Sequence, residues 1–135
     1  GTIFYTNNPC TPITLDGRQS TSSSLGIFFV NTTTLTTIAG VTFRFLCTNA
    51  GYTFTGALAG WSNLVYTGTT RIISGVTYYV YEATYGGTIV PINGTTRLNY
   101  YWTSTNCRAH STLRMEAQAT INGSVQVVTG NAVTI

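Results

Sequence analysis

Apolar and polar residues alternate along two segments of the chain, strictly in one and with Leu46 as an exception in the other. In the segment 112–121 every second side chain is apolar, and in the segment 41–47 the same pattern places Cys47 on the apolar side. A period of two is that of a β-strand with one buried face. We therefore predict strands over both segments. The apolar face of the first comprises Leu113, Met115, Ala117, Ala119 and Ile121, and its polar face comprises Thr112, Arg114, Glu116, Gln118 and Thr120.

Turn signals recur at short intervals between further segments of strand length. Asn122-Gly123 is the strongest of them, because a two-residue type I′ turn needs positive φ at both central positions. About eight or more strands separated in this way favour a β-sandwich or barrel over alternating strands and helices. The other predicted strands are 26–30, 61–66, 70–73, 76–83, 88–92, 95–102 and 124–128.

The composition supports one all-β domain spanning residues 1–135. Only 7% of the residues are charged and none is lysine, whereas 43% are hydrophobic and 13% aromatic. This apolar content is enough for a folded core, and the abundant threonines and tyrosines favour strands. We expect less than about a tenth of the chain to be helical, in line with that strand preference.

The charge distribution excludes some classes of partner. A net charge of +3, spread over dispersed arginines, does not form the basic stripe that binds a phosphate backbone. No run of 18 apolar residues exists, so no segment is expected to span a membrane. We expect neither a nucleic-acid partner nor a membrane partner. The N-terminus has no signal-peptide pattern, so an exported protein would be present here in its mature form.

Groups able to perform acid–base chemistry are scarce. The carboxylates and imidazole of the chain are Asp16, Glu82, Glu116 and His110. Glu116 lies on the polar face of its strand and is interpreted as a solvated surface carboxylate. Cys107 and His110 could form a nucleophilic pair, but nothing supplies a third, orienting group. The sequence therefore predicts no enzyme, no metal and no organic cofactor.

The cysteines favour an exported protein, whereas the sequons are a weak signal because a chain rich in Asn and Thr produces them by chance. Cys10, Cys47 and Cys107 lack metal-ligand spacing, so we expect one disulfide and one remaining thiol, Cys107. Asn31, Asn93 and Asn122 each begin a glycosylation sequon, which matters only in a host that glycosylates exported proteins.

Several segments resemble, in order, the receptor-binding lectin domain of two-domain chaperone-usher fimbrial tip adhesins, the group that includes the mannose-binding type 1 fimbrial adhesin. Cys10 precedes a second cysteine at the end of the apolar strand VTFRFLCTN. The segment TGALAGWSNLVYTGTT is similar to that family's turn and hairpin, and ATINGSVQVVTG is similar to its last strand and linker. Together these segments cover about half of the chain.

The resemblance implies an elongated immunoglobulin-like or jelly-roll β-sandwich with a Cys10–Cys47 disulfide. It also implies an extracellular domain, exported through the periplasm and displayed at the tip of a fimbria. Its partners would be a host glycan or a host surface or matrix protein, together with a pilin domain and fimbrial subunits in the full-length protein.

The same resemblance implies a binding site at the tip, where the loop after the second cysteine meets a loop late in the sequence. The family's acidic pocket residues have no counterparts in CTNAGY or STNCRAHS. Arg108 instead suits an acidic sugar or a carboxylate of a host protein. The implied ligand-binding residues are Asn49, Tyr52, Trp102, Asn106, Arg108 and His110.

A structural role is the alternative. Subunits of a surface filament, or of a viral or phage surface projection, share the low charge and high threonine content. Strand addition between subunits would use an open sheet edge. The segment 1–8 alternates as a donor strand should, but it is short.

Overall fold

The computed structural model describes residues 2–6, 22–31, 33–48, 50–103, 112–129 and 133–134. These residues form eleven strands and no helix, so none of them lies in a helix that could cross a membrane. The strands are β1 (Thr2–Thr6), β2 (Ser22–Asn31), β3 (Ile38–Cys47), β4 (Thr53–Thr55), β5 (Val65–Ile73), β6 (Val76–Thr84), β7 (Thr88–Ile89), β8 (Thr95–Thr103), β9 (Thr112–Ile121), β10 (Ser124–Thr129) and β11 (Val133–Thr134).

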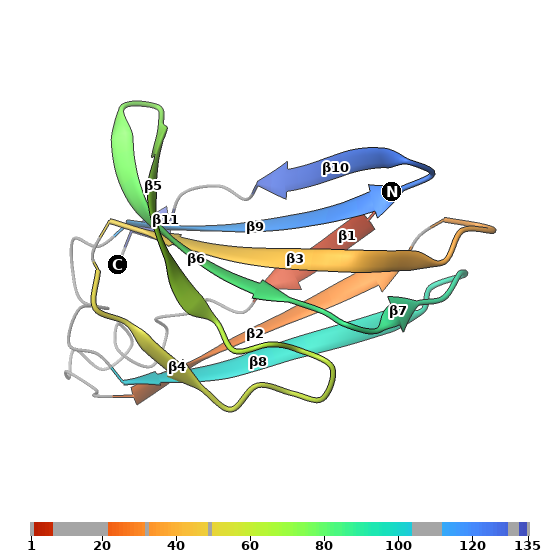
Figure 1. Cartoon of the computed structure of the whole chain (residues 1–135), viewed down its shortest axis with the longest axis horizontal. Helices are drawn as coiled ribbons and strands as arrows, with labels where there is room; N and C mark the ends of the chain where they lie inside the picture. The colour runs from red at the N-terminus through yellow and green to blue at the C-terminus, as the bar shows by residue number, and fades with distance from the viewer. Residues whose placement is uncertain are drawn as a thin grey trace.

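Two antiparallel sheets pack face to face (Figure 1). The smaller sheet has the strand order β1-β2-β8-β4, and the larger has the order β10-β9-β3-β6-β5, with β7 and β11 pairing with β3 and β9. The prediction of an all-β sandwich is thereby confirmed.

The core lies between the sheets and is rich in aromatic side chains. All five apolar residues that alternate along β9 are at most 5% exposed, as their period of two predicts. The ring of Phe45 on β3 packs edge-to-face against three neighbouring rings. Its centroid is 5.4 Å from that of Tyr52, 5.5 Å from that of Phe54 and 6.0 Å from that of Tyr81. Such edge-to-face pairs add to the free energy of burial.

The predicted Asn122-Gly123 hairpin is confirmed. Ser124 pairs with Ile121, and the two turn residues have φ of 52° and 76°. Other strand boundaries were wrong: β7 ends at Ile89, and residues 62–64 are not in a strand. The strands β4 and β11 were not predicted, because such short strands lack a long alternating pattern. β1 lies in the segment 1–8, which was considered only as a short donor strand, and it pairs with β2 of the same chain.

Asn31, at the end of β2, connects the loop around Thr36 to the end of β7. Its side chain is fully buried, and its Nδ2 donates to the carbonyls of Thr36 (2.7 Å) and Ile89 (2.8 Å). Its Oδ1 accepts hydrogen bonds from the backbone N–H and the hydroxyl of Thr33, at 3.0 Å and 2.6 Å. Each polar atom of the side chain is therefore satisfied within the protein.

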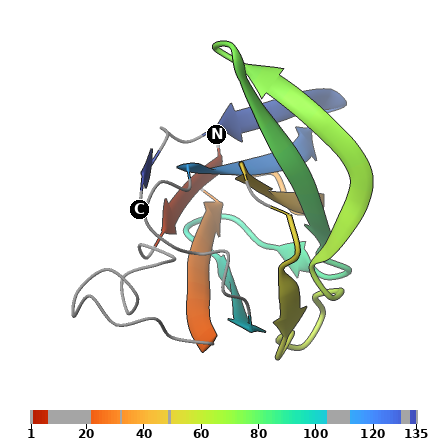
Figure 2. The same ribbon diagram turned by 90° about the vertical axis from the view of Figure 1, so that its left-hand side faces the viewer.

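A β-bulge shapes the hairpin of β5 and β6. The predicted strands 61–66 and 70–73 leave a turn at Thr67-Gly68 between them, but β5 continues through it. The register shifts between the pairs Tyr66–Tyr81 and Thr70–Tyr79. Gly68 has φ of 79°, and the Thr67 hydroxyl donates to the carbonyl of Val80 at 2.9 Å. Because a bulge bends its strand and increases the twist, the hairpin leaves the plane of the larger sheet and rises above β9 and β10 (Figure 2).

Candidate functional site

Three charged side chains form a row across the outer face of the larger sheet. The register pairs Arg44 of β3 with Glu82 of β6 on one side and with Glu116 of β9 on the other. Directly paired residues point to the same face. The Arg44 guanidinium contacts both carboxylates, with Nε 3.0 Å from Glu82 Oε2 and Nη1 2.9 Å from Glu116 Oε2.

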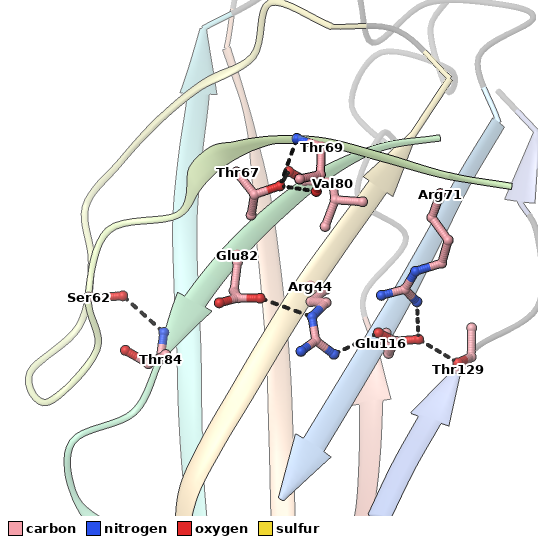
Figure 3. A network of polar contacts seen from close by, with 10 residues as sticks. All are labelled: Arg44, Ser62, Thr67, Thr69, Arg71, Val80, Glu82, Thr84, Glu116 and Thr129. Carbon is pink, nitrogen blue, oxygen red and sulfur yellow. Dashed lines mark hydrogen bonds and ion pairs between the residues drawn. The ribbon is translucent and has the colours of Figure 1, made fainter. Parts of the chain in front are cut away.

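The curved hairpin brings a second arginine onto this row. Arg71 belongs to β5, yet its Nη1 lies 2.6 Å from Oε1 of Glu116 on β9 (Figure 3). The Thr129 hydroxyl of β10 donates to the same oxygen at 2.8 Å. Glu116 is therefore the centre of a network that joins β3, β5, β9 and β10.

The network keeps Glu116 ionised although it is buried. Burial raises the pKa of the carboxyl, but hydrogen bonds from Arg71, Thr129 and Arg44 outweigh it, so the pKa lies below its ordinary value. For the cation Arg44 the effect of burial has the opposite sign and lowers its pKa. Hydrogen bonds to Glu116 and Glu82 outweigh burial and raise the pKa above its ordinary value. The charges of Glu116 and Arg44 thus persist at neutral pH.

The space between the hairpin and the sheet is a groove of about 540 Å³. Its floor comes from the outer faces of β3, β6 and β9, one wall is the bulged part of β5, and the other wall is β10. We call it the hairpin groove. It is lined by Arg44, Thr67, Thr69, Thr70, Arg71, Val80, Glu82, Glu116, Gln118 and Val127.

The hairpin groove offers a ligand fixed charged groups and hydroxyls. Glu116 receives three hydrogen bonds and is ionised, so it has no proton to donate as a general acid. Within the described part of the chain, no three His, Cys, Asp or Glu side chains gather as metal ligands would. Planar charged groups and hydroxyls surround a volume that suits a small ligand.

The interpretation of Glu116 as a solvated carboxylate was wrong. Its side chain is 2% exposed, because Arg71 and the hairpin cover the polar face of β9 at this point. The alternating pattern correctly assigns Glu116 to the outer face but does not show that another strand folds over that face. The strand pairing that aligns Arg44 with Glu82 and Glu116 is likewise not readable from the pattern.

The structure describes only part of the site implied by the family resemblance. Tyr52 lies in the core at 7% exposure, with its hydroxyl 3.4 Å from the Cys47 sulfur, and burial raises its pKa. The backbone of Trp102 belongs to β8 and pairs with Phe54 of β4. The remaining predicted site residues, Asn49, Asn106, Arg108 and His110, lie outside the described residues and stay a prediction.

The structure likewise describes only one of the cysteines in the predicted disulfide. Cys47 ends β3 on the buried face, as its alternating pattern predicts. Cys10 and Cys107 lie outside the described residues, so the Cys10–Cys47 pairing and the role of Cys107 stay predictions.

Comparison with known proteins gives no family. No family model matches the chain, and no curated protein matches it. Among solved structures, a family GH18 chitinase from Chromobacterium violaceum aligns with a TM-score of 0.45 and 14% identity, covering 94% of this chain and 18% of the chitinase. The GAE domain of yeast GGA1 aligns with a TM-score of 0.35 and 12% identity, covering 99% of this chain and 88% of the other. These likenesses are too weak to indicate a function.

Proposed function

We propose that this chain is an extracellular, non-catalytic receptor-binding domain that holds its ligand in the hairpin groove. The observation that carries the proposal is the groove itself, in which ion pairs fix the planar side chains of Arg71 and Glu82 beside exposed threonine hydroxyls. Groups held in place before binding lose little side-chain entropy when a ligand arrives.

The sequence supports an adhesive role for such a domain. The resemblance to the lectin domain of fimbrial tip adhesins suggests display at the tip of a fimbria, with a host glycan or a host surface protein as receptor. Few titratable groups are available for catalysis, and the central one, Glu116, is bound by two arginines. Recognition without chemistry is consistent with both observations.

A binding screen with groove variants tests this proposal. The purified domain is applied to a glycan array and to a panel of host surface and matrix proteins. We expect at least one receptor, whose binding falls at least about tenfold in Thr70→Ala or Glu82→Gln, as expected when a buried hydrogen bond is lost. Thr77→Ala is the matched control, because this exposed threonine lies on the same hairpin outside the groove lining. The absence of any receptor would contradict the proposal.

A filament subunit is the second candidate, and β10 is the observation that favours it. This strand ends the order of the larger sheet, and Val125 and Val127 on it are 61% and 50% exposed. Its segment SVQVVT has neither charge nor proline, the usual features that prevent strand addition at an edge. Sedimentation of the isolated domain distinguishes the two roles: a monomer favours the receptor-binding domain, and polymers that Val125→Lys abolishes favour the subunit.

A further inference from the structure

We infer that the ligand of the hairpin groove is an uncharged, polyhydroxylated molecule, namely a neutral saccharide. This inference rests on the proposed function and specifies its ligand chemistry. The sequence analysis suggested an acidic ligand because of Arg108. Arg108 does not line the groove, so the groove points to a different ligand.

The first argument is the charge balance of the lining. Two arginines and two glutamates line the groove, and each arginine is bonded to at least one of those carboxylates. An anionic ligand would place its charge beside the carboxylates of Glu82 and Glu116 and would compete with Glu116 for Arg71. A cationic ligand would lie beside the guanidinium groups of Arg44 and Arg71. A neutral ligand meets neither repulsion.

The second argument is the supply of hydrogen-bonding groups with room for a ligand. The side chains of Glu82 and Arg71 are 38% and 37% exposed, so one presents a planar acceptor and the other a planar donor. Among the described residues Glu82 bonds only through Oε2, which leaves Oε1 available. The exposed hydroxyls of Thr69 and Thr70 lie on the β5 wall. Neighbouring hydroxyls of a sugar ring both donate and accept hydrogen bonds, so they match this mixture.

The third argument is the opposite wall. Val127 of β10 is half exposed and lines the groove, whereas Val80 in the floor is buried. One exposed aliphatic side chain offers a small apolar surface, which suits the C–H face of a sugar ring. The lining contains no aromatic residue and so does not suit a large flat apolar ligand.

The experiment measures binding of immobilised neutral, sialylated and sulfated glycans at about 50 mM and about 500 mM NaCl, a range over which ionic attraction is strongly screened. We expect binding to neutral glycans that changes less than about twofold with salt, since no net charge is involved. Glu82→Gln and Thr70→Ala should each weaken this binding about tenfold, while Thr77→Ala leaves it unchanged. Unfolding curves establish that every variant is folded.

Each other result has a defined meaning. One such result is binding that is confined to acidic glycans or to a protein, that falls with salt and that remains sensitive to the groove variants. It would overturn the neutral-saccharide inference but leave the receptor-binding function standing. Binding that ignores both groove variants would overturn the assignment of the site to the groove. No binding to any glycan or host protein would contradict the function itself.

Discussion

Glu116 shows how one side chain can connect four strands. It is 2% exposed, it accepts hydrogen bonds from Arg44, Arg71 and Thr129, and the first two of these residues are charged. A buried carboxylate that loses such partners would retain the cost of its desolvation. Its neighbours are consequently held in fixed positions around the groove.

Replacing Glu116 tests this account of the network. Glu116→Gln leaves Arg44 and Arg71 without their shared buried anion, and we expect it to lower the free energy of unfolding at pH 7 by about 3 kcal/mol. Glu82→Gln is the matched control, because Glu82 is 38% exposed and its pair should contribute about 1 kcal/mol or less. Urea unfolding of both variants measures the difference, and equal losses would contradict the central role of Glu116.

The pH dependence has a definite sign. Because the folded-state pKa of Glu116 is lowered, its stabilisation is present above the unfolded-state pKa, about 4.3, and is lost as the pH falls through the folded-state value. The parent protein should therefore lose stability below about pH 4.3 more steeply than Glu116→Gln, and the two unfolding free energies should converge in acid. Parallel pH profiles would show that the carboxylate is not stabilised in the folded state.

Asn31 is a second residue whose role depends on buried hydrogen bonds. Asn31→Asp removes the donors to the carbonyls of Thr36 and Ile89 and places a charge where exposure is 0%, so we expect a loss of about 3 kcal/mol. Asn93→Asp is the control: Asn93 is exposed, and its left-handed φ of 59° is tolerated by Asp, so stability should change by less than about 0.5 kcal/mol. Thermal unfolding compares the two, and a stable Asn31→Asp protein would refute the anchoring role.

At the scale of elements, the sequence predicted those strands and turns whose determinants are local. β9 and its turn into β10 follow from strict alternation and from Asn122-Gly123. The bulge in β5 was mistaken for a turn, because Thr67-Gly68 provides the same positive φ for either structure. Whether a strand continues past such a glycine depends on its pairing with β6, which is not encoded in the segment itself.

The β9–β10 turn permits a test of backbone conformation without side-chain contacts. A Cβ at Gly123 would meet nothing within 4 Å, so Gly123→Ala introduces no steric contact. Its only effect is the strain of an alanine at a φ of 76°, and we expect the free energy of unfolding to fall by about 1 kcal/mol. Gly86 is the control, because its φ is not positive and its added Cβ would be 3.6 Å from the Gly60 carbonyl oxygen, an ordinary contact. Gly86→Ala should be neutral or slightly stabilising. Similar losses for both substitutions in chemical denaturation would contradict the turn assignment.

At the scale of the whole molecule, the sandwich follows from composition and period, but the groove does not. Arg44, Glu82 and Glu116 come from three strands that are distant in sequence, and Arg71 reaches them only because the hairpin bends over the sheet. No local pattern encodes that arrangement. The family resemblance instead implied a site formed by the segment after Cys47 and a segment late in the sequence.

The central claim is that the ligand lies in the hairpin groove, and an NMR titration tests it most directly. The ¹⁵N-labelled domain is titrated with a neutral glycan selected from the array. We predict that the largest amide shift changes occur at Thr69, Thr70, Arg71 and Glu82, with little change around Tyr52. Changes concentrated at Trp102, Asn106 and Arg108 would contradict the groove and support the loop site that the resemblance implies.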